Sequence, residues 1–301
     1  MTADFPAGGL RLSELLGPDQ VVRDGVFFQL DQTAATAPGS LVYCATLKFL
    51  RSALENANVA AVLTTAELAA RVTSLPVAVS PAPRLEFFRL YKRLSEAGVL
   101  RPRMEFGRGE GCRVHPTAVV SDRSLLGRGV VVEARAFVGD HVRLGDGAYV
   151  GQGASIGVDG LMPVWDEAGL AIRFSHAGSV TIGENTVILA GTTVVTSVFQ
   201  RPTSIGHDSY VGLLANVGHD ARVGSRCIIG GNCVIAGAAV VEDGAQVWAS
   251  STVSHGITVG RDARVQIGSV VIDDVEAGRS VSGNFARNHR RHAIERLGRP
   301  R

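Results

Sequence analysis

A six-residue period in the aliphatic residues constrains this chain more than any other feature of its sequence. Aliphatic side chains occupy every sixth position over 114–156, again over 182–194, and without a gap over 205–271. Neither the 3.6-residue period of an α-helix nor the alternation of a two-sided sheet explains this pattern. Three hexads make one triangular coil, so residues 18 apart stack at about 4.8 Å. The sequence therefore predicts a mainly β fold, a left-handed parallel β-helix of between seven and eight coils.

Glycines and interruptions in the period add detail to this prediction. Glycine often follows the aliphatic position, as in Gly183 and Gly218, which is typical of corners where backbones approach closely. The period breaks from Gly157 to about Val180 and again around 196–203. Because loops on a rigid scaffold commonly carry binding groups, we expect both interruptions to lie near a functional site.

The period also divides the chain. We expect a small N-terminal α/β domain over 1–104, the β-helix over 105–278, and a basic tail with one short C-terminal helix over 279–301. Apolar runs and helical spacing predict strands over 41–45 and 59–64 and helices over 47–56, 84–96 and 284–297.

Composition excludes several classes of protein. The net charge of +2 gives no electrostatic case for nucleic-acid binding. No basic leader with an apolar core and no run of 18 apolar residues occurs, so we expect a cytoplasmic protein without an integral membrane segment. Four scattered cysteines without a Cys-x-x-Cys pair favour reduced, buried thiols over disulfides or a zinc site.

His219 is the strongest candidate for chemistry. It lies two positions after the core residue Val217 on a predicted corner, with Gly237 one coil further and His255 about 10 Å away, two coils further. A neutral imidazole is a suitable general base near pH 7, and the Gly237 N–H can stabilise an oxyanion. A purely structural role is also open, because a histidine followed by aspartate is a common choice at a turn.

Residues 217–227 and 235–237 resemble the catalytic segment of the acyltransferases that begin lipid A synthesis. Nearly all of 10–285 is similar to one branch, the UDP-3-O-(3-hydroxyacyl)glucosamine N-acyltransferases known as LpxD. In particular, 156–160 with the insertion after it is similar to the substrate loop of that family. The segment 41–49, with Ser-Pro-Ala-Pro at 80–83, is similar to its uridine-binding domain.

The resemblance implies a trimeric N-acyltransferase with no cofactor or metal. Its donor would be a thioester on acyl carrier protein phosphopantetheine or coenzyme A, and its acceptor a nucleotide-linked amino sugar. His219 would be the base and Gly237 the oxyanion residue, while the rings of Tyr43 and Phe49 would hold uracil. The implied substrate-binding residues are Tyr43, Phe49, Thr46, Asp159, Gly160, Asn216 and His255.

Departures from the family pattern concern the acceptor and acyl pockets. Thr46 replaces the asparagine of the uridine motif, and Gly-Leu-Leu at 212–214 replaces a polar stretch. Leu-Met-Pro at 161–163 replaces an aromatic loop, and the second family histidine aligns one residue away from His255. The long C-terminal helices of the family are mostly absent. These differences leave the acyl length, the sugar and the donor open.

Three different functions also fit the sequence. The first is an N-acyltransferase for another UDP- or dTDP-linked amino sugar. The second is a γ-carbonic-anhydrase-like zinc enzyme, because His219 and His255 have the spacing of its first two ligands, although Gly260 stands at the third. The third is a non-catalytic trimeric binding protein. The basic tail fits an acidic carrier protein, the phosphates of coenzyme A, or a solvated terminus equally well.

Overall fold

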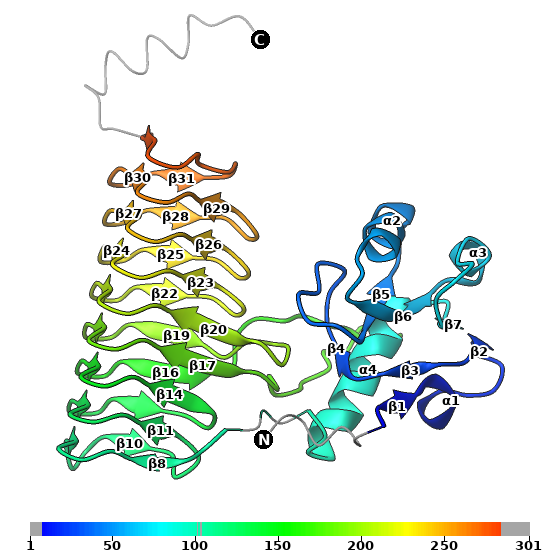
Figure 1. Ribbon diagram of the computed structural model, residues 1–301, viewed down its shortest axis with the longest axis horizontal. Coiled ribbons are helices and arrows are strands. Elements are labelled where there is room, and N and C mark those ends of the chain that lie inside the picture. The colour runs from blue at the N-terminus through cyan, green and yellow to red at the C-terminus, as the bar shows by residue number, and fades with distance from the viewer. Residues whose placement is uncertain (1–7, 101, 103, 284–301) are drawn as a thin grey trace, which may run out of the picture.

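The computed structural model describes residues 8–100, 102 and 104–283 and contains two parts (Figure 1). Among these residues, a column of short stacked strands forms one part, and a smaller sheet with four helices lies beside it. The expected helix over 284–297 and the basic side chains of the tail from Arg287 onward lie outside the described residues. No helix within the described ranges is long and apolar enough to cross a membrane.

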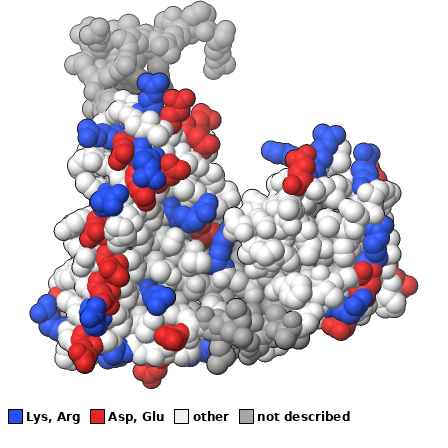
Figure 2. Space-filling view, viewed as in Figure 1, with Lys and Arg blue, Asp and Glu red and all other residues white. Residues whose placement is uncertain are grey.

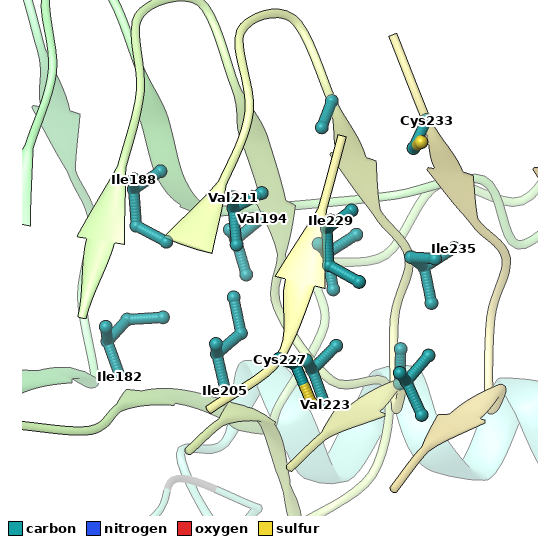
Figure 3. Packing of buried hydrophobic residues seen from close by; sticks show 14 of the residues in the cluster. Ile182, Ile188, Val194, Ile205, Val211, Val223, Cys227, Ile229, Cys233 and Ile235 are labelled. Atoms are coloured by element: carbon teal, nitrogen blue, oxygen red, sulfur yellow. The ribbon is translucent and has the colours of Figure 1, made fainter. Parts of the chain in front are cut away.

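The column is the left-handed parallel β-helix that the six-residue period predicts. In the described part of the chain, its three faces are parallel sheets of eight, eight and nine strands. Residues 18 apart pair within a sheet, as Asn216 does with Val234. The strands pair again across the long interruption, with a register shift after Ile156, and across the short one, where Thr193 pairs with Asn216. The aliphatic residues of the hexads from Leu126 to Val271 are buried inside the prism, where Ile182, Ile205 and Ile229 lie in successive layers (Figure 3). Each such side chain stabilises the fold by about 1.5 to 3 kcal/mol.

The strands of the β-helix divide among its three faces. One face contains β10 (Val119–Val120), β13 (Phe137–Val138), β16 (Ser155–Val158), β19 (Thr193–Val195), β22 (Asn216–Val217), β25 (Val234–Ile235), β28 (Thr252–Val253) and β31 (Val270–Val271). The second contains β8 (Gly107–Arg108), β11 (Leu125–Leu126), β14 (Val142–Leu144), β17 (Ser179–Ile182), β20 (Pro202–Ile205), β23 (Arg222–Val223), β26 (Val240–Val241) and β29 (Thr258–Val259). The third contains β9 (Arg113–Val114), β12 (Val131–Val132), β15 (Tyr149–Val150), β18 (Val187–Ile188), β21 (Tyr210–Val211), β24 (Ile228–Ile229), β27 (Gln246–Val247), β30 (Arg264–Val265) and β32 (Ser280–Val281).

Two positions shape each corner. A Cβ on Gly218, directly after the core residue, would lie 2.7 Å from the backbone nitrogen of Gly237 in the next coil, so close approach explains glycine there. Two residues later the chain adopts the left-handed conformation, for example at Asp220 with φ of 60° and Asp208 with φ of 54°. Aspartate and asparagine tolerate this conformation better than most side chains, which explains their frequency at the corners.

The N-terminal part is a five-stranded sheet in the order β2-β7-β6-β5-β4, parallel except for β2, with β1 and β3 pairing separately. Alternate residues of β5 point to opposite faces: Leu41 packs with helix α4, and Val42 packs with helix α2. The elements are β1 (Leu10–Arg11), α1 (Leu12–Leu15), β2 (Val21–Arg23), β3 (Val26–Phe27), β4 (Gln29–Leu30), β5 (Ser40–Cys44), α2 (Leu47–Glu55), β6 (Val59–Thr64), α3 (Ala66–Ala69), β7 (Val77–Val79) and α4 (Pro83–Glu96).

Helix α4 joins the two parts of the molecule. The long insertion between β16 and β17 reaches across to α4 (Figure 1), where Arg89 forms a two-bond ion pair with Glu167. The buried Tyr91 hydroxyl donates a hydrogen bond to the carbonyl of Val198 in the short insertion and accepts one from the N–H of Ala177 in the long insertion. Both insertions are therefore fixed against the N-terminal part.

Surface charge is mixed on the face seen in Figure 2. Lysine and arginine side chains alternate there with aspartate and glutamate along the β-helix. This face therefore carries no extended patch of one sign. The four cysteine thiols are unpaired, and three of them are buried.

Candidate active site

His219 lies on the corner between β22 and β23, beside both insertions. Its ring is partly buried, with 14% of the side chain exposed, and Asp220 next to it has only 1% exposed. With the proton on Nδ1, His219 donates to Oδ2 of Asp220 across 2.8 Å. This arrangement leaves Nε2 of His219 without a proton and able to accept one.

The short insertion surrounds the Asp220 carboxylate. Ser197 Oγ donates to Oδ1 across 2.6 Å, and Arg201 Nε lies 3.3 Å from the same oxygen. Burial would raise the pKa of Asp220, but the hydrogen bonds from His219 and Ser197 and the charge of Arg201 together lower it below its usual range. Asp220 is therefore a carboxylate at neutral pH and fixes the tautomer of His219.

A second His-Asp pair in the chain has the same local geometry in a different setting. His207 Nδ1 lies 2.8 Å from Oδ2 of Asp208 on the preceding corner of this kind, but both side chains are about half exposed. The turn therefore brings the histidine and aspartate within hydrogen-bond distance, while the Asp208 carboxylate stays half exposed to water. Burial and the contacts of the short insertion distinguish the pair at 219–220, so His207 is a natural control.

Gly237 lies directly against the His219 ring, as the 18-residue stacking predicts. A Cβ at this position would be 2.6 Å from Nε2 of His219 and 2.7 Å from its Cε1. Within the described part of the chain, no carbonyl accepts a hydrogen bond from the Gly237 N–H. The proton-accepting nitrogen and an N–H donor are thus adjacent.

Two further histidines flank His219. The His255 ring centroid lies 6.2 Å from that of His219, closer than the 10 Å expected from coil spacing, because Gly237 places no side chain between them. His176, from the long insertion, lies 6.0 Å away on the other side, and its Nδ1 is 2.9 Å from the carbonyl oxygen of Thr196. His176, His219 and His255 thus form a row of three rings, to which the long insertion contributes His176 and the β-helix contributes the other two.

A cavity of about 880 Å³ includes His176 in its wall, whereas His219, Gly237 and His255 do not line it. Its walls come from the end of α4, the long insertion and the β-helix, and combine apolar residues such as Phe137 and Phe174 with polar ones. Asp159 also lines the cavity, and its Oδ1 accepts a hydrogen bond from the N–H of His176 across 2.9 Å.

The remaining residues of the expected substrate site occupy separate places. A Cβ on Gly160 would meet Val195 at 2.5 Å, so glycine lets the insertion pass close to the β-helix. Asn216 is half-buried in β22, three positions before His219. Gly160 thus has a packing role, whereas Asn216 shares its coil with His219.

The expected uridine residues lie at the C-terminal end of β5. Tyr43 packs its ring against Phe87 and Phe88 of α4, at centroid distances of 5.0 and 6.0 Å. Phe49, in α2, is 48% exposed, and Thr46 at the N-cap of α2 makes no side-chain capping bond. Phe49 is the more accessible ring of the two, because Tyr43 is half-buried.

The histidine row does not complete a metal site. Within residues 8–100, 102 and 104–283, no three His, Cys, Asp or Glu side chains are placed to hold a metal ion. His219 and His255 therefore lack a third donor among those residues.

Three contributors to this site are not evident from the sequence. Ser197 and Arg201 lie in a segment without a period, and His176 comes from the long insertion. The interruptions themselves are the available signal, since both insertions contact the His219 corner.

Comparison with known proteins points to acyltransferases. No family model matches the chain. The chain is 26% identical over 125 residues to an acyl-[acyl-carrier-protein]–UDP-N-acetylglucosamine O-acyltransferase of Campylobacter lari, a match covering 36% of this chain and 46% of that protein. The chain thus spans less than half the length of this curated relative. The match is to an O-acyltransferase and not to the LpxD branch that the sequence motifs resemble.

Solved structures resemble the β-helix at low identity. The UDP-N-acetylglucosamine acyltransferase of Campylobacter jejuni is 23% identical, with a TM-score of 0.45 over 61% of this chain and 77% of that one. The Moraxella catarrhalis UDP-N-acetylglucosamine O-acyltransferase is 19% identical, with a TM-score of 0.46 over 65% and 78%. The six-residue period and the three parallel sheets of the chain itself make it a hexapeptide-repeat β-helix protein.

Proposed function

We propose that the chain is an acyltransferase that moves an acyl group from a thioester to the amine of a nucleotide-linked amino sugar. The observation that carries this proposal is the partly buried His219, held by the Asp220 carboxylate, with its free Nε2 against Gly237. The most specific acceptor is UDP-3-O-(3-hydroxyacyl)glucosamine, a precursor of lipid A, on the strength of the motifs at 156–160 and 217–227.

The chemistry follows from this geometry. The sugar amine attacks the thioester carbonyl carbon as Nε2 of His219 takes its proton, which forms the C–N bond and a tetrahedral oxyanion. The N–H of Gly237 stabilises that oxyanion, and Asp220 stabilises the imidazolium. When the intermediate collapses, the C–S bond breaks and the imidazolium returns the proton to the leaving thiolate. The products are an amide and the free thiol of the carrier protein or coenzyme A.

O-acylation is the second candidate, favoured by the match to the Campylobacter lari O-acyltransferase. The same base would then take the proton of a sugar hydroxyl, and an ester would form. Mass spectrometry after incubation with acyl carrier protein or coenzyme A thioesters separates the two candidates. Two nucleotide sugars serve as paired acceptors. UDP-3-O-acylglucosamine has a free amine that can accept the acyl group, whereas in UDP-N-acetylglucosamine only hydroxyl groups can accept it.

The paired acceptors also distinguish acyl transfer from zinc catalysis and from simple binding. Acylation of the free-amine acceptor alone supports the proposal, and acylation of UDP-N-acetylglucosamine alone replaces it with O-acylation. Loss of activity after chelator treatment would favour a zinc enzyme, since the proposed steps need no metal. Binding of the nucleotide sugars without any product would favour a binding protein.

Phe49 provides a test of the uridine site. Its exposed ring is free to stack on a base, so Phe49→Ala should weaken UMP binding by about 5- to 150-fold, corresponding to about 1 to 3 kcal/mol for base stacking. Isothermal titration calorimetry with UMP measures this change. Leu54→Ala, an exposed apolar change on the same helix, is the matched control. Equal UMP affinity in wild type and Phe49→Ala would refute this assignment.

Exposed apolar side chains support a homotrimer. Leu213, Leu214, Trp248 and Ile267 are all at least 40% exposed and lie on corners that follow strands of one face. A closed assembly would cover them and place active sites between neighbouring β-helices. Light scattering should therefore give a mass three times the 31.6 kDa of one chain. A monomer mass that does not change with concentration would contradict the trimer.

A further inference from the structure

Arg201 lies between two buried carboxylates from different parts of the molecule. Its Nε is 3.3 Å from Oδ1 of Asp220, and its Nη2 is 3.8 Å from Oδ1 of Asp31. Asp220 belongs to the β-helix, whereas Asp31 follows β4 of the N-terminal sheet. The side chains of both aspartates are at most 6% exposed, and that of Arg201 is 23% exposed.

This arrangement suits a guanidinium. A buried carboxylate is costly unless a charge and hydrogen bonds compensate for lost water. The rigid guanidinium of arginine offers N–H groups on separate nitrogens, so it can interact with both aspartates at the same time. Lysine offers one compact charge and cannot reproduce this geometry.

The segment that carries Arg201 is itself anchored. Phe199 is buried between the rings of Phe87 and Tyr91, at centroid distances of 6.3 and 6.2 Å, and the carbonyl of Val198 accepts a hydrogen bond from Tyr91. The N–H of Val198 lies 3.4 Å from Oδ2 of Asp220. Val198 and Phe199 of the short insertion thus contact α4 of the N-terminal part, while the same insertion also contacts the Asp220 carboxylate.

We propose that Arg201 is a positioning residue that, anchored by Asp31 of the N-terminal part, sets the Asp220 carboxylate and through it the tautomer and orientation of His219. This inference rests on the proposed function for its catalytic consequence only. Arg201 touches no reacting atom. It acts by keeping Asp220 in the position where Oδ2 accepts the hydrogen bond from Nδ1–H of His219.

Measuring the tautomer of His219 tests the positioning role of Arg201 independently of any catalytic activity. Protein labelled with ¹⁵N-histidine reports the ring tautomer of His219 at mildly alkaline pH. His219→Ala assigns the signal, and His207 is the internal reference. The variants are Arg201→Met, Arg201→Lys, and Arg128→Met, which removes an exposed arginine paired with Asp146 at 2.9 Å.

We expect a single Nδ1–H tautomer for His219 in wild type and in Arg128→Met. We expect a mixture of tautomers in Arg201→Met and a smaller change in Arg201→Lys. The lysine variant keeps the positive charge, so it serves as the test if the methionine variant does not fold. In the acyl-transfer assay, kcat should fall by about 10- to 100-fold in Arg201→Met with KM nearly unchanged. An unchanged His219 tautomer in folded Arg201→Met or Arg201→Lys overturns the proposal. A mixed tautomer supports it even if wild type transfers no acyl group, an outcome that would reject the proposed function alone.

Discussion

His219→Ala should lower the turnover of acyl transfer by about 10² to 10⁴ while leaving the fold intact, because a positioned general base usually contributes that much. The ring is on a corner rather than in the prism interior, so its removal leaves the buried aliphatic layers unchanged. Steady-state kinetics with a thioester donor and an amino-sugar nucleotide measure the loss. Thermal unfolding and UMP titration confirm that the variant is folded and binds nucleotide.

His207→Ala is the matched control for this experiment. It removes the same side chain, with the same 2.8 Å bond to a following aspartate, from an exposed corner of the same β-helix. We expect its turnover to equal that of wild type. If His219→Ala and His207→Ala behaved alike, with slightly lower stability and unchanged turnover per folded molecule, His219 would be a turn residue and not the base.

The β-helix could be predicted because one repeated requirement fixes it. Every hexad must place an aliphatic side chain inside the prism, and an aliphatic residue accordingly occupies each sixth position from Ile205 to Val271. The same regularity gives the stacking of His219 and Gly237, since residues 18 apart pair in every face. Spacing along the chain thus predicts contacts wherever the period is unbroken.

The insertions could not be predicted in this way. Ser197, Arg201 and His176 meet the His219 corner through tertiary packing against α4, which no local pattern encodes. Asp31 is brought to Arg201 only when the N-terminal sheet docks on the short insertion. Such contacts depend on how separate elements pack, and packing is the step where sequence periodicity carries no information.

Side-chain exposure in the N-terminal part was also beyond the sequence. Tyr43 and Phe49 are both aromatic residues of the motif at 41–49, and the motif alone treats them alike. In the structure Tyr43 packs against Phe87 and Phe88, whereas Phe49 faces solvent. The difference arises because Tyr43 lies in β5 on the side of the sheet covered by α4, which carries large aromatic residues, whereas Phe49 lies in α2, whose buried residues are Leu50 and Ala53.

Gly237→Ala should lower turnover by about 10²-fold, although the change adds only one methyl group. The new Cβ would lie 2.6 Å from Nε2 of His219, closer than real Cβ contacts, so the ring must move. Because the backbone N–H remains, the loss comes from misplacing the base, and displacement by about 1 Å can cost that much. The kcat of the variant, with its unfolding midpoint, measures the effect.

A double-mutant cycle shows whether this loss passes through His219. In the His219→Ala background no ring remains for the new methyl group to displace, so Gly237→Ala should lower turnover there by less than about twofold. Gly231→Ala is the control, because Gly231 occupies the same corner position one hexad earlier, where a Cβ would lie 3.3 Å from the carbonyl oxygen of Leu213. Its turnover should stay close to that of wild type. An equal loss from Gly237→Ala with and without the His219 ring would mean that Gly237 acts on the reaction independently of the base.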